Sequence, residues 1–170
     1  MTPIKVNITY TPEDLQKSYM LHFNKKLPLR SRRTLFISII LILLGVFLYY
    51  VDVFNGEMNW LCWFFMGYGV ALIFYYFIRL YTMGKRFFKK LPEFSNNFTY
   101  VFSEEGISVT GVKLSSNLKW NHFRSALITN ELVLLYPNEI RFNIFPKKYF
   151  IDNQYEQFVQ LVKKNIPDWK

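Results

Sequence analysis

Two long uncharged apolar runs, separated by a short acidic break, constrain this 170-residue chain more than any other feature. The first run covers residues 34–51 and the second covers residues 58–78. As helices they would be about 27 and 32 Å long, close to the ~30 Å thickness of a bilayer's hydrocarbon core. A chain of this length lacks the mass to surround two such helices. The sequence therefore predicts a transmembrane hairpin over residues 34–78, with spans at 34–53 and 58–78 and an outer turn at 52–57.

Basic residues are concentrated just outside both ends of this hairpin. Residues 1–33 carry seven Lys or Arg against two acidic residues, and residues 79–90 carry five and none. By the positive-inside rule, both termini are cytoplasmic and the turn faces outward. Such a collar attracts anionic lipid without specificity. It consists of Lys25, Lys26, Arg30, Arg32, Arg33, Arg79, Lys85, Arg86, Lys89 and Lys90.

The remaining part, residues 91–170, holds nine basic and eight acidic residues, so the basic charge of the chain does not point to a nucleic-acid partner. Aromatic residues in the second run suit the headgroup level at either end of the span. These expected interfacial anchors are Trp60, Trp63, Tyr75, Tyr76 and Tyr81.

Small residues within the runs allow helices to approach closely. They are Gly45, Gly67 and Ala71, and they predict packing of the hairpin on itself or, alternatively, a dimer interface. Asp52 and Glu57 flank the outer turn as solvated loop charges or, alternatively, as contacts to a cationic partner.

The cytosolic parts show shorter patterns. Residues 1–33 predict an alternating strand at 4–10 and an amphipathic helix that Thr11 can cap, and residues 79–92 predict a basic helical stalk. Residues 93–170 predict strands near 98–102, 107–111, 117–120, 122–129, 131–136 and 140–145. A final helix, capped by Asp152, should end at Pro167. The fold class is thus an α+β membrane protein with a small antiparallel barrel or sandwich and a C-terminal helix. The first strand could pair with an edge of this sheet.

Several segments resemble the YcxB-like family of bacterial membrane proteins. They are FTYVFSEEGISV at 98–109, Trp120, LVLLY at 132–136 and IFPKKYF at 144–150. The resemblance implies a pleckstrin-homology-like domain at 93–170 and a location in the bacterial inner membrane. It supplies no catalytic residue.

One departure concerns phosphate binding. Glu104 and Glu105 occupy the first turn of this domain, where headgroup-binding relatives of the fold carry cations, and carboxylates would repel a phosphate. Lys113, Lys119, Lys147 and Lys148 remain candidates for headgroup contact.

The sequence offers no arrangement typical of an enzyme. Cys62 is the only cysteine, and His22 and His122 lie in separate segments without metal-binding spacing. We expect no enzymatic activity, no metal and no cofactor. The first hypothesis is a membrane protein whose cytosolic domain binds a protein or forms oligomers. The second is an immunity or resistance protein against a toxin or bacteriocin, by analogy of architecture. An oligomeric transport component is the third.

Overall fold

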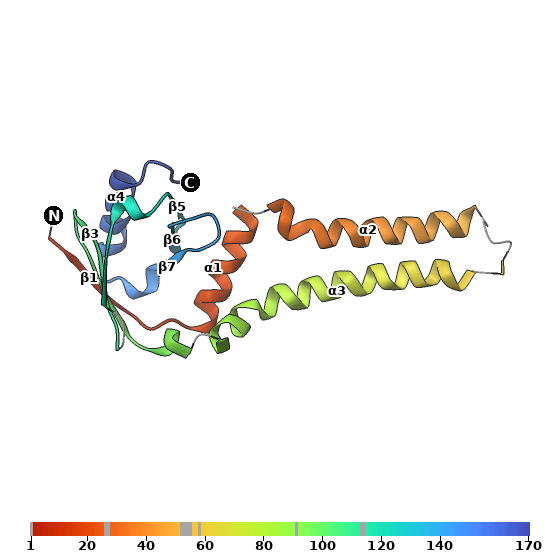
Figure 1. The fold of residues 1–170 in the computed structure, drawn as a ribbon, viewed down its shortest axis with the longest axis horizontal. Helices are drawn as coiled ribbons and strands as arrows, with labels where there is room; N and C mark the ends of the chain where they lie inside the picture. The colour runs from red at the N-terminus through yellow and green to blue at the C-terminus, as the bar shows by residue number, and fades with distance from the viewer. Residues whose placement is uncertain (1, 26–27, 52–55, 58, 91, 113–114) are drawn as a thin grey trace. The chain divides into compact units, whose positions relative to one another are not determined.

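The computed structural model describes residues 2–25, 28–51, 56–57, 59–90, 92–112 and 115–170 (Figure 1). Lys26, Asp52 and Lys113 lie outside these residues, as does most of the expected outer turn. The fold is α+β, as predicted. The chain divides into two compact units, one formed by Met1–Ser18 together with Gly84–Lys170 and the other by Tyr19–Met83.

Two long helices form most of the Tyr19–Met83 unit. Helix α2 spans Pro28–Tyr50, and helix α3 begins at Asn59 and continues to Lys90, through the segment predicted as a helical stalk. The two helices run side by side (Figure 1). Both are long and apolar enough to cross a membrane, by length and composition.

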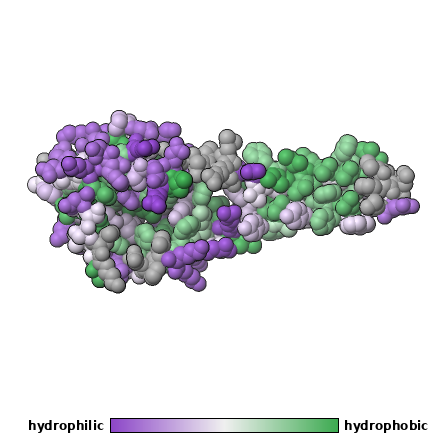
Figure 2. Space-filling view, in the orientation of Figure 1, coloured by the Kyte–Doolittle hydropathy of each residue, from purple (hydrophilic) through white to green (hydrophobic). Residues whose placement is uncertain are grey.

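Large apolar side chains cover the outer surface of this helix pair. Ile40 is 62% exposed, Phe47 61% and Phe74 66%, and Figure 2 shows a continuous hydrophobic surface over this part of the chain. In the most apolar window of each helix, only 11% of the residues are buried. An apolar surface of this extent is costly to expose to water.

Glycines set the contact between α2 and α3. A Cβ atom at Gly69 would lie 2.6 Å from Ile42 Cγ1 and 2.8 Å from the Ser38 carbonyl oxygen. A Cβ at Gly45 would lie 2.8 Å from the carbonyl oxygen of Cys62. These distances are too short for any side chain, so glycine is required for the two backbones to approach this closely.

The packing expected of Gly67 and Ala71 within the hairpin is not observed. Both residues are exposed, and a Cβ at Gly67 would meet no atom within 4 Å. Gly69 lies two positions from Gly67, about 200° around the helix, and makes the contact instead. Of the three predicted small residues, only Gly45 lies between the helices.

The second unit contains two antiparallel sheets. The first has the order β1-β2-β3-β4 and the second the order β5-β6-β7. The strands are β1 (Ile4–Ile8), β2 (Phe98–Phe102), β3 (Gly106–Thr110), β4 (Ser115–Lys119), β5 (Ser125–Ile128), β6 (Leu132–Tyr136) and β7 (Asn143–Pro146). All the expected strands are present with shifted ends. The predicted strand at 122–129 is shortened because Trp120–His122 forms a 3-10 turn before it.

The N-terminal strand pairs with the sheet, as the alternation of residues 4–10 allowed. Ile4 lies opposite Phe102 and Ile8 lies opposite Phe98 in the β1–β2 ladder. Ile4, Val6 and Ile8 are buried, whereas Lys5 and Asn7 are exposed. The sheet is therefore completed by residues that precede the long helices in sequence.

An aromatic cluster joins the sheets to the C-terminal helix α4, which spans Gln154–Asn165. Phe158 from α4 lies with its ring centroid 4.3 Å from that of Phe102 on β2 and 5.3 Å from that of Phe145 on β7. All three side chains are fully buried. Their burial supplies a core for a unit whose chain is discontinuous in sequence.

The expected cap of α4 was wrong by one residue. Asn153, not Asp152, precedes the helix, and its side chain forms no capping hydrogen bond. Asp152 adopts a left-handed conformation with φ 48°. The side chain of Gln154 accepts a hydrogen bond from the Ile151 N–H, at 3.2 Å. This glutamine takes over part of the role assigned to the aspartate.

Candidate functional site

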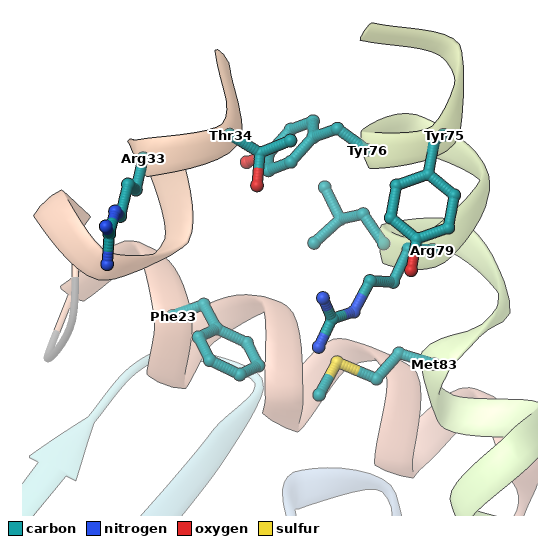
Figure 3. Close-up of a pocket in the computed structure, with 8 residues that line it drawn as sticks. Phe23, Arg33, Thr34, Tyr75, Tyr76, Arg79 and Met83 are labelled. Atoms are coloured by element: carbon teal, nitrogen blue, oxygen red, sulfur yellow. The ribbon is translucent and has the colours of Figure 1, made fainter. Parts of the chain in front are cut away.

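A pocket of about 300 Å³ lies within the Tyr19–Met83 unit, at the end of the hairpin where α2 begins (Figure 3). Its walls come from α2, α3 and α1, a helix that spans Pro12–Lys25. It is lined by Phe23, Arg33, Thr34, Tyr75, Tyr76, Arg79, Leu80 and Met83.

Helical spacing brings the α3 residues of the pocket to one face. Tyr75, Arg79 and Met83 follow one another at intervals of four, and Tyr76 and Leu80 repeat that interval one position along. Thr34 and Arg33 come from the first turns of α2. The pocket therefore combines polar groups from two helices with an apolar floor.

Arg33 and Arg79 give the pocket its charge. Both are exposed, and among the residues that the structure describes neither forms an ion pair with a carboxylate. The acidic residues between positions 19 and 83 are Asp52 and Glu57, which lie at the turn joining α2 to α3. Figure 3 shows the Arg79 guanidinium reaching into the space between Phe23 and Met83. Two guanidinium groups without a local carboxylate create a site of positive potential.

Hydroxyl groups and aromatic rings complete the lining. Thr34 supplies a hydroxyl from α2, and Tyr75 and Tyr76 supply phenols from α3. In Figure 3 the ring of Tyr76 extends from α3 toward Thr34. These groups can donate hydrogen bonds to an acceptor, so the pocket is chemically suited to an oxyanion next to an apolar group.

The other predicted collar and anchor residues do not line the pocket. The described side chains of the collar are exposed elsewhere, whereas the side chain of Arg30 lies outside the description. These exposed residues are Lys25, Arg32, Lys85, Arg86, Lys89 and Lys90. Among the expected anchors, Trp60, Trp63 and Tyr81 are 62%, 63% and 67% exposed, while Tyr75 and Tyr76 line the pocket.

A second polar cluster lies in the other unit and is centred on Asp14, in the first turn of α1. Its carboxylate accepts hydrogen bonds from the Thr11 N–H and hydroxyl, both at 3.0 Å, and from the Tyr149 hydroxyl at 2.9 Å. Lys148 Nζ lies 2.8 Å from the same carboxylate. The Asp14 N–H in turn donates to the Thr11 hydroxyl, which makes a reciprocal cap of α1. The cluster fastens α1 to the segment after β7.

The surroundings of Asp14 stabilise its charged form. Burial alone would raise the pKa of this carboxyl, but the hydrogen bonds from Lys148, Thr11 and Tyr149 outweigh burial and hold the pKa below its usual range. For Lys148, burial favours the neutral amine, yet the Asp14 carboxylate raises the pKa of that amine. This pair is therefore structural.

The lysines considered for headgroup contact in this unit are partly engaged. Lys148 pairs with Asp14, and Lys147 lies 2.7 Å from Glu156. Lys119 is exposed on β4. In the turn after β2, Glu104 pairs with Lys164 at 2.8 Å. The described cationic groups of this unit do not converge on a pocket.

The sequence did not reveal the Asp14 cluster, although the spacing Thr11-x-x-Asp14 before an apolar helix was a readable signal. His22 is buried with its ring 5.4 Å from that of Phe23, and Cys62 is fully buried against Gly45. His122 is exposed next to Phe123.

The comparisons with known proteins bear on the second unit. A family model described as YcxB-like protein matches residues 102–162, from the end of β2 into α4. The resemblance inferred from the sequence is confirmed, and over these residues the chain belongs to the YcxB-like family. No curated protein and no solved structure matches the chain at a significant level.

Proposed function

We propose that this chain is a non-enzymatic protein of the bacterial inner membrane, with α2 and α3 as membrane spans and a cytoplasmic binding domain. The apolar outer surface of α2 and α3 carries this proposal. Lipid removes the cost of exposing that surface, and helices satisfy their own backbone groups within a bilayer.

The β1–β2 pairing supports a topology with both termini on one side. The two strands belong to one sheet, and the chain between them contains α2 and α3. An even number of crossings must therefore separate them. The basic residues before α2 and at the end of α3 then favour the cytoplasm for that side.

The four-plus-three arrangement of antiparallel strands with a C-terminal helix supports a pleckstrin-homology-like domain. The domain binds a protein partner or a second copy of the chain. Strand β4 supports this role because it is an outer strand of its sheet, and outer strands offer backbone groups for pairing with another chain. Val112, 75% exposed, lies close to it in sequence.

An alternative role, immunity or resistance to a toxin, places the partner in the membrane. The exposed positions of Gly67 and Ala71 favour it, because four-residue spacing of small side chains lets another helix approach α3. In that case Gly67→Leu abolishes protection by the protein, whereas Val112→Glu on the cytoplasmic domain leaves protection intact. The opposite pattern supports the first role.

Topology labelling tests the membrane proposal directly. In a Cys62→Ala background, we expect a cysteine at Glu57 to react with an impermeant thiol reagent in intact cells. One at Ser115 should react only after lysis, because it lies on the cytoplasmic side. Both positions are exposed in the structure, so a lack of reaction does not follow from burial. Labelling of Ser115→Cys in intact cells contradicts the topology.

A further inference from the structure

We propose that the pocket at the end of the hairpin binds the phosphate of one anionic phospholipid, with Arg33 and Arg79 as its ligands. This inference rests on the membrane placement proposed above. It goes beyond non-specific attraction by a basic collar, because it assigns binding to two of the ten basic residues.

The charge of the pocket selects an anion. The two arginines come from different helices and line one cavity. Arginine presents a planar fork of donors that matches two phosphate oxygens, which a lysine cannot do. Neither guanidinium is paired with a carboxylate in the described part of the chain, so an incoming phosphate displaces no internal ion pair.

The position of the pocket selects a lipid over a free phosphate. Toward the middle of α2 and α3, the surface next to the pocket becomes apolar on all sides, with Ile37 43% and Phe74 66% exposed. Acyl chains attached to a bound phosphate would cover that surface. Tyr75 and Tyr76 lie where amphipathic rings prefer the headgroup level.

The size of the pocket limits it to a single headgroup. About 300 Å³ is at the small end of the range for ligand pockets, roughly 300–1,000 Å³. Thr34 and the two tyrosines add neutral donors for the remaining phosphate or glycerol oxygens. We therefore expect one tightly held lipid per chain, in contrast to the many loosely held lipids of a diffuse collar.

Native mass spectrometry of the full chain in detergent tests this proposal. Titration with phosphatidylglycerol should show one saturable site, with about tenfold preference over phosphatidylcholine of the same acyl chains. Arg33→Gln combined with Arg79→Gln should remove that preference, since each charge-assisted contact accounts for about a tenfold change in affinity. The matched control, Arg32→Gln combined with Arg86→Gln, removes the same charge from exposed positions outside the pocket and should keep it.

Further arms keep the interpretation unambiguous. Arg33→Lys combined with Arg79→Lys retains the charge and should bind with intermediate selectivity. Glycerol phosphate and inorganic phosphate should not compete at concentrations where the lipid saturates, and competition by either would identify a soluble phosphate as the ligand and overturn the proposal. Equal loss in the pocket and control variants would also overturn it, in favour of a diffuse collar. If the Gln pair fails to fold, the headgroup preference and stoichiometry of the wild type decide. Equal lipid binding with correct topology labelling refutes the pocket alone, whereas failed labelling refutes the membrane proposal.

Discussion

At the scale of single residues, Asp14 connects more parts of its unit than any sequence motif indicated. Its side chain is 6% exposed and contacts Thr11 in the turn before α1 as well as Lys148 and Tyr149 after β7. Tyr149 also donates a hydrogen bond to the Thr9 carbonyl oxygen. Helix capping and tertiary contact thus depend on the same carboxylate.

Replacing Asp14 by Asn should lower the free energy of unfolding of this unit by about 1–3 kcal/mol at pH 7, because hydrogen bonds to a charged acceptor are lost. The pKa of Asp14 is lower in the folded protein than its ordinary value of about 3.9. The carboxylate therefore stabilises the fold above about pH 4, and this contribution is lost as the pH falls through the folded pKa. Thermal unfolding of both proteins between pH 7 and pH 3 should show their difference shrinking on acidification.

Glu156→Gln is the matched control for that experiment. It removes a carboxylate from the exposed pair with Lys147, whose side chains are 54% and 47% exposed, and exposed pairs contribute little. We expect a smaller effect than for Asp14→Asn. A wild-type-like Asp14→Asn protein would show that Lys148 and Tyr149 find equivalent partners without the charge.

At the scale of the elements, two glycines of α3 make opposite predictions. Gly69→Ala should push α2 and α3 apart, because its Cβ would lie 2.8 Å from the Ser38 carbonyl oxygen. Gly67→Ala adds the same methyl group where nothing lies within 4 Å. Spin labels on the two helices, measured by pulsed electron resonance, should report a longer distance in the Gly69→Ala protein alone. A longer distance in both would mean that the contact depends on helix flexibility.

This pair of glycines also marks where prediction from sequence stops. Alternation and turn signals were sufficient to predict the strands, because each depends on neighbours in the chain. The face of α3 that meets α2 depends on helix rotation, and positions 67 and 69 both carry glycine within an apolar helix. The collar was likewise visible in the sequence. The selection of Arg33 and Arg79 from its ten members was not, because it requires three helices to converge.

At the scale of the whole molecule, the hairpin is an insertion within a folded unit. Gln16 Oε1 accepts a hydrogen bond from the Gly84 N–H at 2.6 Å, so the two ends of the insertion are close within that unit. We expect that replacing residues 19–83 by about six Gly and Ser residues, which can span roughly 20 Å, yields a water-soluble protein. It should unfold cooperatively, as followed by circular dichroism.

The same chain without residues 1–18 is the informative comparison. It lacks β1, so the inner edge of β2 and the residues beneath it lose their cover. Tyr10 is also lost, and its buried hydroxyl donates to the Ile144 carbonyl oxygen at 2.7 Å. We expect a lower midpoint of unfolding and a tendency to aggregate through the open edge. Equal stability of the two proteins would show that β1 is dispensable.

The pairing of Ile4 with Phe102 has a consequence for biosynthesis. The ribosome makes β1 first and reaches β2 only after both long helices, a delay of roughly 5–20 s at 5–20 residues per second. During that time the first strand has no partner, while the helices that follow it must enter the membrane. Insertion must therefore finish before the domain can close, and a translation pause after α3 would lengthen the exposure of an unpaired strand to chaperones and proteases.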